Sequence, residues 1–95
     1  MIRLSVLYPK GDNTTFDHDY YREKHVPLCS RTWKPDAVEI DRGVDGPYVA
    51  AVHVVFKSQE AMSAALANSG ELMADVPNYT NITPVMQISE VVETK

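Results

Sequence analysis

The chain has 95 residues, of which 44% are hydrophobic and 23% are charged, and its net charge at pH 7 is −4. This length suits one domain spanning residues 1–95, and the apolar content argues against a disordered chain. The acidic balance, with no cluster of Lys or Arg, argues against nucleic acid or an anionic membrane surface as a partner.

The first predicted element is a strand at the N-terminus. Residues 2–9, "IRLSVLYP", alternate with the period of two that is typical of a half-buried strand. Arg3, Ser5 and Leu7 point to one face, and the largely apolar residues at 2, 4, 6 and 8 point to the other. We therefore expect the second set in the core.

A helix is predicted after the loop at residues 9–13. Asp17 is a suitable N-cap, and Phe16 and Tyr21 have the spacing of a hydrophobic staple. A capping box formed by Thr14 and Asp17 is an alternative start, which leaves the boundary open by about two or three residues.

One face of this helix is expected to enter the core. At about 100° per residue, one stripe contains four residues: Tyr21, His25, Leu28 and Thr32. Pro27 has no N–H to bond the carbonyl of Glu23, so it should bend the helix without ending it, and the helix should continue to about Thr32. Such a bend would open a gap beside His25.

The second half of the chain predicts two further strands, a helix and a last strand. Residues 37–44 alternate, whereas Tyr48–Phe56 has no polar face and is expected to be a central strand that is covered on both sides. Ser58 is a suitable cap for the second helix, and Gly70 is expected to end or break it. The inner stripe of this helix is Met62, Ala65, Leu66 and Ser69, and the last strand lies within residues 84–93.

The resulting order is β-α-β-β-α-β, an α+β arrangement. It predicts a four-stranded antiparallel sheet with both helices on one face. The opposite face would expose a mixed set of residues: Arg3, Ser5, Leu7, Val49, Ala51, His53 and Val55. Because a contiguous apolar surface marks an interface or a ligand site, we expect a homodimer whose sheets pack face to face around a partly polar space.

The N-terminal apolar run is too short for a signal peptide, and no run approaches the ~20 residues of a membrane span. The single cysteine, Cys29, cannot form an intramolecular disulfide. A cytoplasmic protein is therefore expected.

Two motifs carry a resemblance to a known family. The segment "FDHDYYREKHVPL", residues 16–28, resembles the signature of the EthD family of small dimeric α/β-barrel proteins. The segment "ADVPNYT", residues 74–80, resembles its second landmark, an acidic-x-Pro-x-aromatic turn, with Tyr79 where phenylalanine is commoner. The resemblance extends over essentially the whole chain.

This resemblance implies a ferredoxin-like subunit and a dimer joined through its sheets. The family is named for a role in ethyl tert-butyl ether degradation beside an oxygenase system, and its members are often described as reductases. Similar barrels act as lactone isomerases, polyketide cyclases and cofactor-free or haem-dependent monooxygenases, so the fold alone does not determine the reaction.

His25 is the candidate catalytic residue, because imidazole titrates near pH ~6.5 and serves as an acid or a base. The alternative is a structural histidine that donates to a backbone carbonyl. The expected ligand contacts are Arg3, Ser5, Leu7, Tyr21, His53 and Val55. Arg3, Ser5 and His53 either pair with one another and with acidic residues across the dimer, or contact a ligand carboxylate or carbonyl.

Other chemistries have weaker support in the sequence. Cys29 is four residues after His25, but no third residue orients the pair, and a lone cysteine is usually an apolar filler. The spacing of His18, His25, His53 and Cys29 matches no zinc pattern, and no Gly-rich phosphate loop is present. No metal and no cofactor are therefore expected.

Two functions remain open. One is a small enzyme that acts on a hydrophobic or carbonyl-bearing metabolite, with oxidoreductase- or isomerase-like chemistry and His25 as acid or base. The other is a non-catalytic protein that holds such a metabolite for an oxidative degradation or biosynthetic pathway. A haem-binding barrel is a third, weaker alternative.

Overall fold

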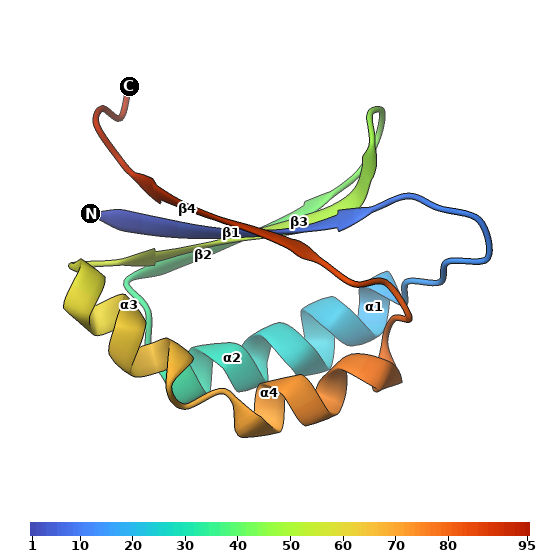
Figure 1. Ribbon diagram of the computed structural model, residues 1–95, viewed down its shortest axis with the longest axis horizontal. Coiled ribbons are helices and arrows are strands. Elements are labelled where there is room, and N and C mark those ends of the chain that lie inside the picture. The colour runs from blue at the N-terminus through green and yellow to red at the C-terminus, as the bar shows by residue number, and fades with distance from the viewer.

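The strands form one antiparallel sheet in the order β2-β3-β1-β4, with the helices packed on one side of it (Figure 1). The computed structural model describes all residues, 1–95. The strands are β1 (Ile2–Pro9), β2 (Ala37–Arg42), β3 (Tyr48–Phe56) and β4 (Val85–Glu90). The α-helices are α1 (His18–Tyr20), α2 (Val26–Trp33), α3 (Gln59–Leu66) and α4 (Gly70–Asp75). This arrangement confirms the predicted ferredoxin-like order.

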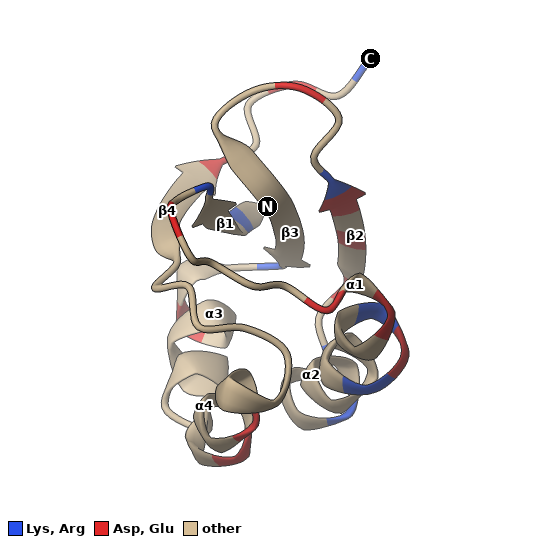
Figure 2. Ribbon diagram, turned by 90° about the vertical axis from the view of Figure 1, so that its right-hand side faces the viewer, with Lys and Arg blue, Asp and Glu red and all other residues tan.

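The core lies between the sheet and the helices. Leu4 of β1 and Val54 of β3 are each 1% exposed, which confirms the predicted inward faces of both strands. β1 and β3 occupy the two central positions, as the doubly apolar sequence of β3 predicts. Figure 2 shows that Lys, Arg, Asp and Glu lie on the helices, on the loops and on the edge strands β2 and β4. None of the helices combines the length and the hydropathy needed to cross a bilayer.

The opposite face of the sheet has no covering layer within this chain. The strand register places Ser5 beside His53, and the Ser5 Oγ lies 2.8 Å from Nδ1 of His53. The other ring nitrogen, Nε2, lies 3.0 Å from the carboxylate of Asp41. The predicted pairing of polar residues on this face therefore occurs within one chain, whereas the buried Nε of Arg3 has no hydrogen-bond partner.

The start of the first helix is determined by Asp17. Its carboxylate accepts the backbone N–H of Tyr20 at 3.0 Å, and the rings of Phe16 and Tyr21 lie 5.0 Å apart as the expected staple. The Thr14 hydroxyl donates instead to the carbonyl of Gly11. The capping-box alternative is therefore not adopted.

A π-helical turn, Tyr21–His25, separates α1 from α2. In this turn the N–H of Val26 donates to the carbonyl of Tyr21, five residues earlier. Pro27 follows directly and has no N–H with which to continue the α-helical bonding of the preceding turn. The helix nevertheless continues to Trp33, so the predicted distortion without termination is confirmed.

The π turn also corrects the predicted core stripe of this helix. One extra residue in the turn rotates everything after it by about 100°. Tyr21 and His25 are buried as expected, but beyond the turn Val26 and Cys29 are buried, whereas Leu28 and Thr32 are only half-buried. The prediction for Leu28 and Thr32 was wrong because it assumed an unbroken period of 3.6.

The second helical segment consists of two helices. The Ser58 hydroxyl accepts the N–H of Ala61 at 3.1 Å, which confirms the predicted cap of α3. Gly70 is not the C-cap of α3 but the first residue of α4. A 3-10 turn, Val76–Asn78, then carries the chain toward β4.

We predict that Gly43, in the β2–β3 connection, cannot be replaced by alanine without loss of stability. A Cβ atom there would collide with the backbone carbonyl of Tyr48 and the backbone of Val49. Gly43→Ala should lower the free energy of unfolding by about 1–3 kcal/mol. Gly70→Ala is the matched control, because a Cβ there meets no atom within 4 Å, and it should be neutral or stabilising by up to about 1 kcal/mol. Equal urea midpoints for the two variants would contradict this account.

Candidate functional site

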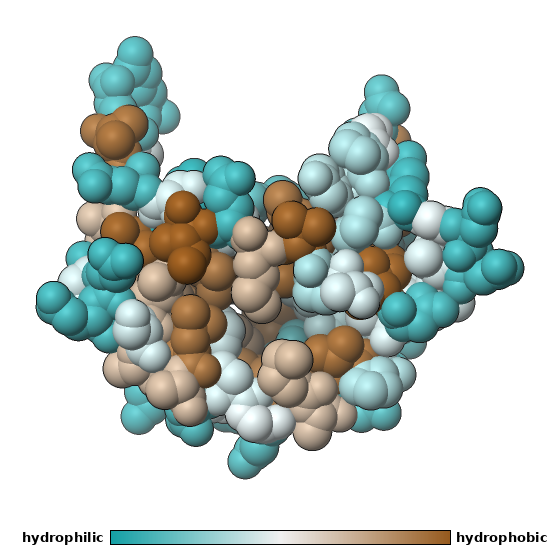
Figure 3. Space-filling view, in the orientation of Figure 1, coloured by the Kyte–Doolittle hydropathy of each residue, from teal (hydrophilic) through white to brown (hydrophobic).

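A cavity of about 150 Å³ lies between the sheet and the helices. Of its 17 lining residues, 14 are hydrophobic, and they come from both central strands and from every helical segment except α1. Met73 of α4 and Met86 of β4 line the cavity and are each more than half exposed. Figure 3 shows a hollow ringed by apolar side chains on the face that carries these two elements. The cavity is thus apolar and opens between α4 and β4.

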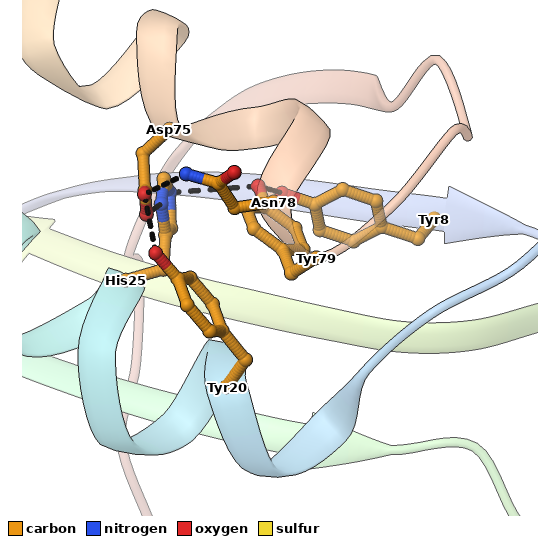
Figure 4. A network of polar contacts seen from close by, with 6 residues as sticks. All are labelled: Tyr8, Tyr20, His25, Asp75, Asn78 and Tyr79. Atoms are coloured by element: carbon orange, nitrogen blue, oxygen red, sulfur yellow. Dashed lines mark hydrogen bonds and ion pairs between the residues drawn. The ribbon is translucent and has the colours of Figure 1, made fainter.

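His25 enters the cavity wall from the π turn and is paired with Asp75 at the end of α4 (Figure 4). Its Nδ1 lies 2.9 Å from Oδ2 of Asp75, and the two side chains are 11% and 15% exposed. A carboxylate only accepts hydrogen bonds, so the ring must donate from Nδ1. In the neutral imidazole the lone pair is then on Nε2.

Asp75 receives two further hydrogen bonds. The Tyr20 hydroxyl donates to its Oδ1 at 2.7 Å, and the side-chain amide of Asn78 donates to the same oxygen at 3.0 Å. Burial acts to raise the pKa of Asp75, but the hydrogen bonds from Asn78, Tyr20 and His25 outweigh it and hold the pKa below its usual value. The group is therefore an ionised carboxylate at neutral pH.

A pair of buried tyrosine hydroxyls lies on the other side of His25. The hydroxyls of Tyr8 and Tyr79 are 2.8 Å apart, and that of Tyr79 is 3.5 Å from Nε2 of His25. Burial raises the pKa of both tyrosines, against a smaller opposing effect of neighbouring hydroxyls at Tyr8. Both therefore remain protonated donors at neutral pH.

The structure divides the predicted site residues between the two faces of the sheet. His25 and Tyr21 line the cavity, with their rings stacked 5.4 Å apart. The other predicted ligand contacts lie on the uncovered face: Arg3, Ser5, Leu7, His53 and Val55. A single small ligand cannot touch both groups within one subunit.

Sequence reasoning missed Asp75, Tyr8 and Tyr79 as partners of His25. The separation between His25 and Asp75 is 50 residues, so no local spacing rule connects them. The available signal was the second motif, which contains both Asp75 and Tyr79 and was treated only as a landmark. Tyr8 was placed in the core without a role.

Cys29 also lines the cavity and is 7% exposed. Burial raises the pKa of its thiol to about 11. At neutral pH it is therefore a thiol and not a thiolate, which agrees with the reading of this residue as an apolar filler.

Comparison with known proteins relates the chain to solved structures. No family model matches the chain, and no curated protein matches it. The crystal structure of an EthD-like protein from Ralstonia eutropha JMP134 shares 34% sequence identity, with a TM-score of 0.92 over 99% of this chain and 94% of that chain. 

Two more distant structures share the fold. An ethyl tert-butyl ether degradation (EthD) family protein from Bacillus halodurans C-125 has 17% identity and a TM-score of 0.68, covering 97% of this chain and 99% of that one. HapK from Hahella chejuensis has 10% identity and a TM-score of 0.70, covering 100% of this chain and 96% of that one. The EthD-like protein from Ralstonia eutropha is similar to this chain in both sequence and structure over nearly its full length. This chain therefore belongs to the EthD family.

Proposed function

We propose that this protein is an acid–base enzyme in which His25 moves a proton on a small apolar molecule held in the cavity. The observation that carries this proposal is the orientation of the imidazole. Ionised Asp75 holds the proton on Nδ1, and the lone pair of Nε2 is left at the wall of the cavity with one long contact of 3.5 Å to Tyr79. An imidazole held in one tautomer by a carboxylate is suited to general base catalysis.

The apolar lining supports a proton-transfer role. A base works on weakly acidic protons most effectively where water is excluded, because its charged conjugate acid is then stabilised by fixed partners instead of mobile solvent. Here the fixed partner is Asp75, whose own charge is stabilised by Tyr20 and Asn78. No oxidant or reductant is needed for such a step.

We predict that His25→Gln and Asp75→Asn both lower turnover while the protein remains folded. The first change removes the base and should reduce kcat by about 10²–10⁴-fold. The second turns the amide NH₂ toward Nδ1, forces the proton to Nε2, and should cause a loss of comparable size. Turnover is measured on a panel of neutral carbonyl compounds and phenols, and ¹⁵N NMR of the imidazole reports the tautomer.

His18→Gln is the control, because it removes a histidine from the same helical segment without touching the cavity. If His25→Gln and Asp75→Asn only lower the melting temperature and leave turnover per folded molecule unchanged, the pair is a structural link between helices. Ligand binding by the wild type without any turnover would identify a non-catalytic carrier and would also contradict the proposal.

We predict that the stabilising contribution of Asp75 depends on pH. Its pKa is lower in the folded protein than the usual value of 3.8, so its contribution is present above that value and is lost as the pH falls through the folded-state pKa. Asp75→Asn should therefore be less stable than the wild type at pH 7 by about 1–3 kcal/mol. Thermal unfolding between pH 3 and 7 should show the two curves converging at the acidic end; a constant gap would exclude this role.

We also propose that the uncovered sheet face is covered by a second copy of the chain. Leu7 and Val55 are only half-buried on this face, and their apolar surface flanks the Ser5–His53 pair. Packing two such faces together would remove this surface from water.

We predict that light scattering will give twice the chain mass for the wild type and that Leu7→Asp will dissociate the dimer. Leu7 pairs with Ala51 of β3, which in turn pairs with Asp41 of β2. An aspartate at position 7 would therefore bury a negative charge in the dimer interface, on the same line of paired residues as Asp41. Val44→Asp is the control, because Val44 is 98% exposed in the β2–β3 connection. A monomer mass for the wild type at micromolar concentration would exclude the dimer.

A further inference from the structure

The hydroxyl pair of Tyr8 and Tyr79 has a proton left to donate. The two hydroxyls carry one proton each, and the 2.8 Å contact between them uses only one. The Tyr21 hydroxyl also lies beside that of Tyr8, and because it adds one proton and one contact, one proton is still left over. The contact from Tyr79 to Nε2 of His25 is 3.5 Å, which is too long for a strong hydrogen bond. Both side chains are 3% exposed, so bulk water does not readily satisfy this donor. A ligand oxygen placed here would satisfy it.

The size of the cavity restricts the ligand. Its volume of about 150 Å³ equals that of an engineered apolar cavity that stays dry and binds benzene. One six-membered ring therefore fills it, whereas a fused two-ring compound would have to extend through the mouth beside Met73 and Met86.

The charge of the site restricts the ligand further. Asp75 is ionised and lies against His25 in the wall, so an anionic ligand would place a second negative charge in an apolar space. A neutral ligand avoids this cost. The cavity chemistry thus favours a neutral one-ring compound with an oxygen that accepts the tyrosine proton.

We propose that the cavity binds neutral one-ring ketones and their enol or phenol tautomers, and that the protein interconverts the two forms. This inference rests on the proposed function of His25. Nε2 of His25 takes a proton from the carbon next to the carbonyl, and the electron pair of that C–H bond forms the C=C bond. The carbonyl π electrons move to oxygen, which takes the spare proton of the tyrosine pair.

The proton on His25 then returns to Tyr79, 3.5 Å away, so both groups regain their starting state. One C–H bond is broken and one O–H bond is formed. The product is an isomer of the substrate, and no oxidant, reductant or cofactor takes part.

The oxygen site is tested by ¹⁹F NMR titration with three one-ring compounds: 4-fluorophenol, fluorobenzene, which lacks the oxygen, and 4-fluorobenzoate, which is an anion. The wild type should bind 4-fluorophenol about tenfold more tightly than the other two, the effect of one good hydrogen bond. Replacing both Tyr8 and Tyr79 with phenylalanine should abolish this preference, because either hydroxyl alone still has a proton to donate. Tyr48→Phe, which removes a hydroxyl outside the cavity, should keep it. Fluorobenzene binding as tightly as 4-fluorophenol would overturn the oxygen site.

The reaction is tested by NMR of cyclohexanone in D₂O, where the wild type should accelerate deuterium exchange next to the carbonyl. His25→Gln should lose this acceleration and still bind 4-fluorophenol. Phenol binding without accelerated exchange would overturn the tautomerisation and the proposed role of His25, but not the oxygen site. Exchange that requires His25 without any preference for the phenol would overturn the oxygen site and retain the base.

Discussion

The ionised carboxylate of Asp75 is the interaction on which the rest of the site depends. It joins Tyr20 and His25 of the first helical segment to the end of α4, and it accepts hydrogen bonds from Tyr20, His25 and Asn78. A carboxylate with this number of donors stays charged although its side chain is only 15% exposed. The same three bonds position the helices around the cavity and select the tautomer of His25, so packing and chemistry share one group.

The π turn makes this arrangement possible. Tyr21 and His25 share a face with or without it, but by adding a residue to the helix the π turn brings Val26 and Cys29 inward after them. In an unbroken α-helix the inward positions after the turn would be Leu28 and Thr32, and the cavity would have a different wall. π turns are uncommon and are frequently found at functional sites, which agrees with the position of His25 at its last residue.

The two faces of the sheet serve different purposes. The helix-covered face holds the cavity and the polar chain that runs from Asp75 through His25 to Tyr79 and Tyr8 (Figure 4). The other face holds the separate group of Ser5, His53 and Asp41, whose hydrogen bonds are completed within the chain. Because strand side chains alternate, neighbouring residues of β1 contribute to both faces: Tyr8 to the cavity and Leu7 to the uncovered surface.

The sequence by itself determined the elements whose signals are local. The alternation of residues 2–9, the doubly apolar run Tyr48–Phe56 and the caps at Asp17 and Ser58 depend on neighbours within a few positions, and all four were predicted correctly. The burial of His25 followed from the same reasoning. Only the tertiary structure determined the partner of His25. Asp75 lies 50 residues away along the sequence, and helix or strand periodicity relates only residues a few positions apart. The π turn, too, was determined only by the tertiary structure. Its local geometry is less favourable than that of an α-helix, and the packing of Tyr21, His25 and Cys29 in the core stabilises it.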